Sequence, residues 1–257
     1  MTIDINGARI YYEVHGAGRP VLLLHGWGGK CESWLPVLRD FKASFRLVAL
    51  DFPGHARSSD PPEPWGVQDY MEATACFMRE MHIEGADVVA HSFGGRVAVM
   101  LAATHPELVG KLVLTGVPAI KGAATFAQKA RGTLYKALRS LATGAPARAI
   151  LGEERTKAAR EALVQKFGSA DYKVLSPAMR KTFSLIVAQD LAAYLPRISA
   201  PTVLFWGADD TAAPLWVGKG MEKAIPDAGL VVMEGAGHFA YLDRYADFRA
   251  VLENFLR

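Results

Sequence analysis

The sequence predicts an α/β protein with a mostly parallel, doubly wound sheet of eight strands and a helical cap. Short apolar runs of strand length alternate with amphipathic stretches of helix length. Most of these runs are nearly continuous in Val, Leu and other apolar residues, as expected of parallel strands covered on both faces. Prolines also fall where elements should begin or end, at Pro106, Pro118, Pro201, Pro214 and Pro226.

The expected elements follow from these runs in chain order. The first two strands form an edge hairpin, because residues 9–14 alternate apolar with polar side chains. Strands are predicted over residues 3–5, 9–14, 21–24, 47–50, 86–90, 111–114, 202–206 and 230–233. Helices are predicted over residues 33–43, 68–82, 93–105, 215–224 and 245–256.

The strand signal disappears between Pro118 and Pro201. This stretch is rich in Ala, Lys, Arg and Leu, which favours several helices with a break around residues 144–146. We therefore expect one core domain made of residues 1–118 and 201–257. A helical lid, residues 119–200, is expected as an insert in that core.

Composition excludes several classes of protein. The chain has 257 residues, 51% of them hydrophobic, which excludes disorder and low-complexity repeats. Two cysteines, Cys31 and Cys76, are too few for a disulfide framework. A net charge of +3 argues against a nucleic-acid partner. With neither an apolar leader nor a membrane-length apolar run, we expect a cytoplasmic protein with no membrane span, either a monomer or a homodimer.

The sharpest chemical motif is a strand that runs through a serine directly into a helix. Ser92 is flanked two positions away by the small residues Ala90 and Gly94, as a strained strand-turn-helix elbow requires. The turn places the Phe93 amide at a helix N-terminus, where it can stabilise negative charge. Taken alone, such a serine could equally be a helix N-cap.

Three further polar sites each follow a predicted strand. A glycine-rich loop after residues 21–24 can present the Trp27 amide as a second donor to an oxyanion. Asp209 and Asp210 come just after residues 202–206, where a carboxylate could orient a base or cap the next helix. His238 lies on a glycine-rich turn after residues 230–233, and a histidine there could also serve a structural hydrogen bond.

The joint order of oxyanion loop, serine, acid and histidine resembles the α/β-hydrolase superfamily, in its lid-bearing esterase and carbon–carbon hydrolase branch. The resemblance covers essentially the whole chain, including residues 51–58, which look like the family's turn after the fourth strand. Two positions depart from the family pattern. Ala90 and Ala56 stand where the family usually has glycine.

The resemblance implies a role for each of these residues. Ser92 is the expected nucleophile, His238 its general base and later acid, and Asp210 the residue that orients His238. Asp210 is preferred to Asp209 because the family places its acid three residues after the glycine of the Trp-Gly pair, here Gly207. The backbone amides of Trp27 and Phe93 are the expected oxyanion hole. His91 is expected to be a supporting hydrogen-bonding residue.

Neither a metal nor a cofactor is expected, because the histidines lack ligand spacing and the chain has neither a dinucleotide fingerprint nor a P-loop. Charge divides unevenly: residues 120–200 carry 14 Lys or Arg and 5 Asp or Glu, a net of +9 that leaves −6 elsewhere. A basic lid could attract an acidic substrate or simply be a solvated helix face. Pocket candidates are Phe126, Leu134, Tyr135, Phe183 and Trp216.

The function expected from these residues is hydrolysis of a small-molecule carboxylic ester, or a related acyl bond, through an acyl-enzyme, as in a carboxylesterase of EC class 3.1.1. One alternative is a carbon–carbon bond hydrolase acting on an acidic diketone. A cofactor-free haloperoxidase or perhydrolase would use the same three residues. A rival of another class is a ligand receptor with the hydrolase fold. Haloalkane dehalogenation is disfavoured, because it needs a carboxylate at position 92.

Overall fold

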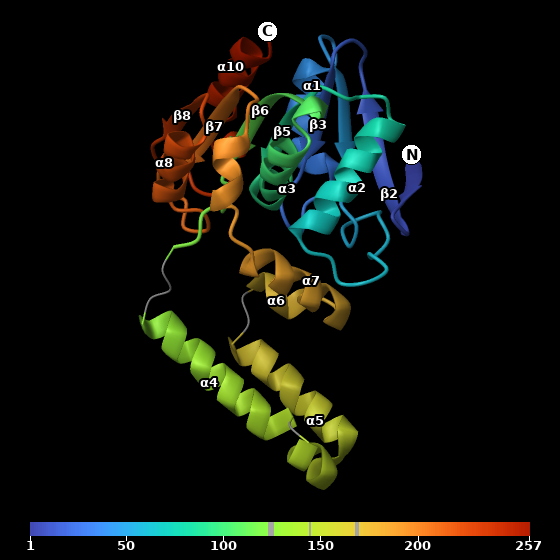
Figure 1. Ribbon diagram of the computed structural model, residues 1–257, viewed down its shortest axis with the longest axis vertical. Coiled ribbons are helices and arrows are strands. Elements are labelled where there is room, and N and C mark those ends of the chain that lie inside the picture. The colour runs from blue at the N-terminus through green and yellow to red at the C-terminus, as the bar shows by residue number, and fades with distance from the viewer. Residues whose placement is uncertain (123–125, 144, 168–169) are drawn as a thin grey trace. The chain divides into compact units, whose positions relative to one another are not determined.

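The eight apolar runs form one sheet, with strand order β1-β2-β4-β3-β5-β6-β7-β8, in a computed structural model of the chain (Figure 1). The predicted eight-stranded, mostly parallel sheet is therefore confirmed. The structure describes residues 1–122, 126–143, 145–167 and 170–257. The strands are β1 (Thr2–Ile5), β2 (Ala8–His15), β3 (Pro20–Leu24), β4 (Arg46–Leu50), β5 (Ala86–His91), β6 (Val109–Thr115), β7 (Thr202–Gly207) and β8 (Ala228–Met233).

Of the eight strands, β2 alone runs against all the others. β1 and β2 form an antiparallel hairpin, and β2 also pairs antiparallel with β4. Asn6 and Gly7 both have positive φ, 50° and 78°, as a two-residue hairpin turn of matching twist requires. All other pairs, from β4 through β3 to β8, are parallel. The carboxyl ends of the parallel strands consequently meet at one edge of the sheet.

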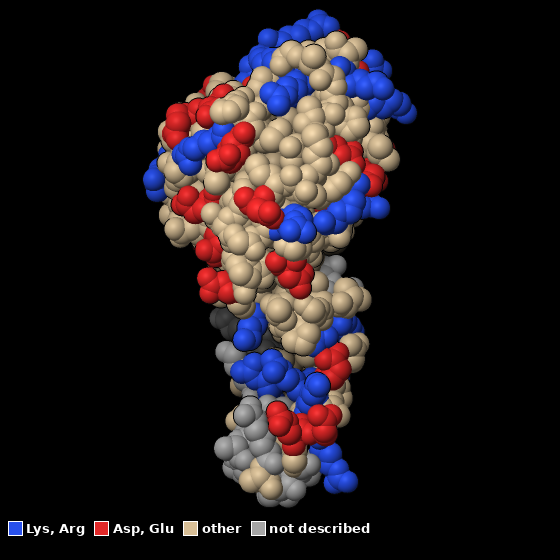
Figure 2. Space-filling model, turned by 90° about the vertical axis from the view of Figure 1, so that its right-hand side faces the viewer, with Lys and Arg blue, Asp and Glu red and all other residues tan. Residues whose placement is uncertain are grey.

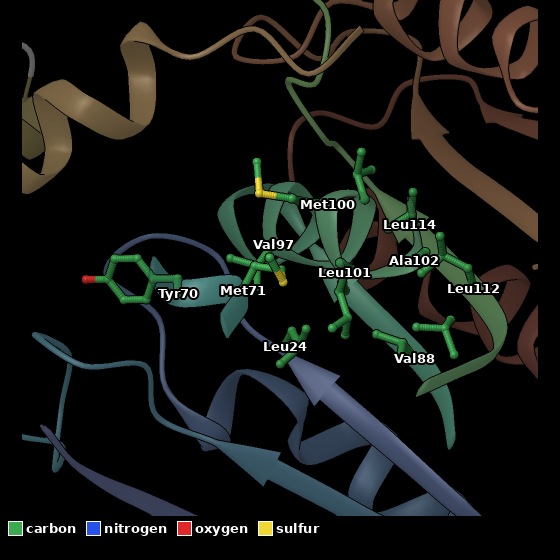
Figure 3. Packing of buried hydrophobic residues seen from close by; sticks show 14 of the residues in the cluster. Leu24, Tyr70, Met71, Val88, Val97, Met100, Leu101, Ala102, Leu112 and Leu114 are labelled. Carbon is green, nitrogen blue, oxygen red and sulfur yellow. The ribbon is translucent and has the colours of Figure 1, made fainter. Parts of the chain in front are cut away.

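Each central strand buries alternate residues in two separate cores, because successive side chains point to opposite faces. In β3, Leu22 and Leu24 belong to one cluster and Val21 and Leu23 to the other. Figure 3 shows the first cluster, where apolar side chains of the strands, among them Leu24, lie near those of α3 (Ser92–Thr104). This two-sided burial explains the nearly continuous apolar runs in the sequence.

Helices cover both faces of the sheet. The first cluster includes residues of α2 (Val67–Glu80), α3 and α8 (Leu215–Ala224). The second includes residues of α1 (Leu35–Phe41) and α10 (Tyr245–Leu256). Shorter helical segments are η1 (Cys31–Trp34), η2 (Pro106–Leu108), η3 (Ala192–Arg197) and α9 (Ala240–Asp243).

The chain divides into two compact units: unit 1, made of residues 1–121 and 184–257, and unit 2, made of residues 122–183. Among the described residues of the stretch predicted to be helical, the α-helices are α4 (Phe126–Thr143), α5 (Ala145–Phe167), α6 (Ala170–Val174) and α7 (Pro177–Ala188). Residue 144, part of the expected break, lies outside the described residues. Within α5, Gly152 interrupts the helix with φ 77° and ψ 170°.

Unit 2 is shorter than the insert that the sequence predicts over residues 119–200. The difference lies mainly at its C-terminal end, where Ile186, Leu191 and Leu195 are buried in the first core cluster. A backbone hydrogen bond also links the chain before unit 2 to the chain after it, since the Leu191 amide donates to the Ala119 carbonyl at 2.9 Å. Packing and hydrogen bonding thus place residues 184–200 in the unit that carries the sheet.

Charged side chains of both signs lie on the face of unit 1 that is visible in Figure 2, where Lys and Arg are interspersed with Asp and Glu. By contrast, residues 122–183 carry 12 Lys or Arg and 4 Asp or Glu. Across the described helices, none is both long and apolar enough to cross a membrane.

Candidate active site

Ser92, Asp210 and His238 each follow the carboxyl end of a parallel strand. Ser92 follows β5, Asp210 follows β7 and His238 follows β8. Of these strands, β7 and β8 are neighbours, and only β6 separates β5 from β7. Residues far apart in the sequence are therefore brought to one edge of the sheet.

The turn at Ser92 is strained. Its φ is 51°, in the left-handed region that residues with a side chain rarely adopt. The backbone is also crowded: a Cβ on Gly94 would lie 2.4 Å from the Leu24 carbonyl oxygen, and one on Gly26 would lie 2.7 Å from Nδ1 of His91. Small residues beside the serine are required for this reason, as the sequence predicts. Ala90, the departure from the family pattern, is fully buried in the core.

A row of hydrogen bonds joins the three side chains. Nε2 of His238 lies 2.9 Å from Oγ of Ser92, and Nδ1 of the same ring lies 2.8 Å from Oδ2 of Asp210. A carboxylate only accepts hydrogen bonds, so Nδ1 carries the proton and donates a hydrogen bond to Asp210. Nε2 is then the unprotonated nitrogen and accepts from the Ser92 hydroxyl. This arrangement can remove a proton from the hydroxyl.

Asp210, and not Asp209, occupies this position. Asp210 is buried, and its Oδ1 accepts hydrogen bonds from the amides of Ala212 and Ala213, each at 2.8 Å. Asp209 is exposed, and its amide donates to the Ala236 carbonyl at 3.0 Å. Two amide donors together with the imidazole N–H fix the orientation of the Asp210 carboxyl group.

Two neighbouring histidines are buried and neutral. Burial lowers the pKa of both His91 and His25 to about 3. His91 Nε2 donates to the backbone carbonyl of His238 at 3.0 Å, which fixes the turn that carries that ring. His25 Nε2 accepts from the Phe52 amide at 3.0 Å and its Nδ1 donates to the Gly26 carbonyl at 2.6 Å.

The two predicted oxyanion donors lie on the elements expected for them. Phe93 is in the first turn of α3, where amides precede the first intrahelical hydrogen bonds. Trp27 is half-buried in the loop after β3. Their rings touch edge to face, with centroids 5.4 Å apart. The Gly94 amide donates to the His25 carbonyl at 3.1 Å and joins the loop to the helix.

Gly116 is a site residue that the sequence analysis missed. It follows β6 with φ 57°, and a Cβ there would lie 3.1 Å from Nδ1 of His238 and 3.2 Å from Oδ2 of Asp210. Gly207, whose Cβ would lie 2.3 Å from the Ala236 carbonyl oxygen, admits the His238 turn in a similar way. A glycine two residues after the strand predicted over residues 111–114 is the one sequence signal that could have identified Gly116.

The predicted pocket residues lie on several different elements. Side chains of Leu134 and Tyr135 are on α4, where Leu134 is 53% exposed and the Tyr135 ring contacts Phe167. Phe183, on α7, has a ring contact with Tyr172. Trp216, on α8 in unit 1, is 48% exposed. The side chain of Phe126 lies outside the described residues.

The turn over residues 51–58 contains Ala56, the second position at which this chain departs from the family pattern. Ala56 has φ 46°, a left-handed conformation that glycine adopts without strain. Asp51 and Arg57 hold the turn, with Nε of Arg57 2.9 Å from Oδ2 of the buried carboxylate. Within the described part of the chain, no cluster of three or more His, Cys, Asp or Glu side chains could hold a metal ion.

Comparisons with known proteins show what this chain is similar to. A family model described as "alpha/beta hydrolase fold" matches residues 19–245. A 2-hydroxy-6-oxo-6-phenylhexa-2,4-dienoate hydrolase from Comamonas testosteroni is 29% identical, covering 99% of this chain and 93% of that protein. A pimeloyl-[acyl-carrier protein] methyl ester esterase from Chromobacterium violaceum is also 29% identical, covering 95% of this chain and 97% of that protein.

Solved structures show the same fold. An enol-lactonase from Burkholderia xenovorans superimposes with a TM-score of 0.75 at 23% identity, covering 100% of this chain and 99% of that one. A meta-cleavage product hydrolase from Pseudomonas fluorescens gives a TM-score of 0.74 at 22% identity, covering 100% and 97%.

Proposed function

We propose that this chain, which belongs to the alpha/beta hydrolase fold family, hydrolyses a carboxylic ester or a related acyl bond of a small molecule through an acyl-enzyme on Ser92. The observation that carries the proposal is the row of hydrogen bonds from Oγ of Ser92 through the His238 ring to Oδ2 of Asp210. A serine hydroxyl is a weak nucleophile unless an adjacent base removes its proton, and this row supplies both the base and its orienting acid.

The proposed reaction proceeds in two halves. Nε2 of His238 takes the hydroxyl proton while Oγ of Ser92 attacks the carbonyl carbon, and the carbonyl oxygen becomes an oxyanion. The amides of Trp27 and Phe93 bind that oxyanion. The intermediate collapses to an acyl-enzyme, and the imidazolium gives its proton to the departing alcohol. A water molecule, activated by the same ring, then releases the acid and frees Ser92.

His91 and Gly116 support this cycle. The hydrogen bond from His91 to the His238 carbonyl holds the turn of the base, and Gly116 lets the β6 backbone lie directly against the His238–Asp210 pair. Both residues come from elements packed in the sheet core, so the base keeps its position through both halves.

A second candidate is hydrolysis of a carbon–carbon bond in an acidic diketone. The curated relatives favour it, because the Comamonas testosteroni protein is a dienoate hydrolase and a Pseudomonas relative with 27% identity is a 2-hydroxymuconate semialdehyde hydrolase. An anionic substrate would also suit the excess of Lys and Arg in residues 122–183.

Turnover of two substrates tests the proposal. An aryl acetate and a 2-hydroxy-6-oxo-dienoate are offered to the wild-type protein, to Ser92→Ala and to Ser44→Ala. Ser44 is a matched control because it is exposed, in the turn after α1. We expect ester turnover, a loss of about 10⁴-fold or more in kcat for Ser92→Ala, and no loss for Ser44→Ala. A higher kcat/KM for the dienoate supports the second candidate. Turnover that survives in Ser92→Ala contradicts both candidates.

A further inference from the structure

Arg96 is a buried cation one helical turn after Ser92. Only 5% of the residue is exposed. Its guanidinium donates to three backbone carbonyls: from one terminal nitrogen to Pro118, and from the other to Ile186 at 2.9 Å and to Gln189 at 2.7 Å. Arg96 is not among the residues that the sequence predicts for the site.

These carbonyls come from the two segments that connect unit 2 to unit 1. Pro118 lies in the outgoing segment, residues 116–121, and Ile186 and Gln189 lie in the returning segment, residues 184–191. The segments also bond to each other: Leu191 donates its amide to Ala119, and Lys121 donates its amide to Oδ1 of Asp190 at 3.4 Å. Arg96 therefore joins both segments to the helix that begins at Ser92.

The outgoing segment touches the proposed catalytic residues. Gly116, two residues before Pro118, lies against Nδ1 of His238 and Oδ2 of Asp210. Val117 packs on the same helix, because a Cβ on Gly95 would lie 2.2 Å from its Cγ2 atom. Because only Val117 separates Pro118 from Gly116, a shift of Pro118 would also displace Gly116 relative to the His238 imidazole.

Burying the Arg96 guanidinium costs free energy, because the charge loses its contact with water. Desolvation lowers the pKa of Arg96 to about 10, so the group is still charged at neutral pH. Its Nε has no hydrogen-bond partner among the described atoms, and Asp190 is the acid that offsets its charge. An apolar side chain would avoid this cost but would remove three hydrogen bonds to carbonyls, of which the Ile186 carbonyl also accepts from the Gln189 amide at 3.3 Å. What the arginine uniquely supplies is a fork of donors that reaches both segments.

We propose that Arg96 is a positioning residue: it clamps the outgoing and returning segments to the nucleophile helix and thereby holds Gly116 against the His238–Asp210 pair. This role rests on the proposed function for its catalytic consequence, whereas the clamp itself does not depend on any activity. Lysine cannot reproduce the fork, since its ammonium is a single point of donation.

The test compares Arg96→Met, Arg96→Lys and a control, Arg79→Met, whose arginine is exposed and pairs with Glu107. Amide hydrogen exchange is followed in peptides from residues 116–121 and 184–191, together with steady-state kinetics on an aryl ester. In Arg96→Met we expect exchange in both segments to rise about tenfold or more and kcat to fall about 10- to 100-fold with KM changed less than threefold. Arg96→Lys should lie between this variant and wild type, and Arg79→Met should match wild type.

Several results decide the matter. A folded Arg96→Met with wild-type exchange in both segments overturns the clamp. Raised exchange with unchanged kcat overturns the positioning role, as does a loss of kcat that Arg79→Met shares. Should Arg96→Met fail to fold, the same comparison is made on Arg96→Lys, with a smaller rise in exchange expected. If the wild-type protein hydrolyses neither substrate, the proposed function fails and with it the positioning role, while hydrogen exchange still decides the clamp.

Discussion

Unit 1 and unit 2 differ in how completely their side chains are fixed. Unit 1 holds both apolar cores and all three residues of the hydrogen-bonded row, of which Asp210 is buried and Ser92 and His238 are half-buried. In the described part of residues 122–183, only Thr156, Val164, Met179 and Thr182 are buried. The proposed chemistry thus rests on a densely packed scaffold, whereas most predicted pocket residues lie on helices whose described side chains are mostly exposed or half-buried.

The units also differ in charge. Unit 2 carries three times as many basic as acidic residues, 12 against 4. Its best-defined ion pair joins Arg180 to both carboxylate oxygens of Glu161 at 2.6 and 2.9 Å. Substitutions in the hydrogen-bonded row of unit 1 should act on the rate of the chemical step, and substitutions in the ion pair of unit 2 on local stability.

The largest effect is expected for Asp210→Asn in unit 1. The amide keeps the shape of the side chain but can donate as well as accept, so Nδ1 of His238 no longer has to carry the proton. We expect kcat to fall about 10³- to 10⁴-fold on an aryl ester, with little change in the melting temperature. Asp209→Asn is the matched control, because that carboxylate is exposed, and it should keep wild-type kcat. Equal losses in the two variants would contradict the role given to Asp210.

Gly116→Ala should have the next largest effect. The added Cβ would lie 3.1 Å from Nδ1 of His238, and the residue already has φ 57°. We expect kcat to fall about 10- to 100-fold and the free energy of unfolding to fall by about 1–2 kcal/mol. Gly229→Ala, where nothing lies within 4 Å of the new Cβ, is the control in the same unit. If Gly116→Ala keeps full activity, the contact with the His238–Asp210 pair is unimportant.

Acid should weaken unit 1 through its buried histidines. The pKa of His25 and of His91 is about 3 in the folded protein and about 6.5 in the unfolded chain. Between these values the unfolded chain binds more protons, so stability falls as pH falls. The loss is about 1.4 kcal/mol per pH unit for each histidine. Urea unfolding from pH 7 to 5 should show a smaller slope for His91→Gln than for wild type, and identical slopes would contradict this account.

The smallest effect is expected in unit 2 for Glu161→Gln. The Arg180 guanidinium holds the pKa of Glu161 at about 2. The contribution of this pair is complete above the ordinary pKa near 4.5 and is lost as pH falls toward 2. We therefore expect kcat on an aryl ester to change less than twofold at pH 7. Hydrogen exchange in α5 should be faster than in wild type at neutral pH, and the difference should shrink below pH 4.5.

Much of the fold could be predicted because the parallel strands are buried on both faces. A run such as Val21–Leu24 has few other stable environments, and its two-sided burial is now visible in the two clusters. The serine elbow could be predicted for a similar reason. The contacts of Gly26 and Gly94 leave no space for larger side chains, so small residues at these positions indicate the crowded turn in the sequence.

Other features left no local signal. Gly116 meets His238 only because β6 lies beside β7 in the sheet, a fact of strand order that no short motif carries. Ile186 and Leu191 belong to the helical stretch of the sequence, yet they are buried in the core of unit 1. No local pattern in the sequence indicates that Arg96 is buried, because its three carbonyl partners come from distant segments. Each of these depends on tertiary contacts between distant segments.

The central claim is that the row of hydrogen bonds activates Ser92 within unit 1. The most direct measurement is modification of the folded protein by a serine-directed fluorophosphonate, followed by peptide mapping. We predict about one modification per chain, on Ser92, with a rate that falls about 10³-fold or more in Asp210→Asn. A folded wild-type protein in which Ser92 stays unmodified, or in which Asp210→Asn reacts as fast as wild type, would contradict the account.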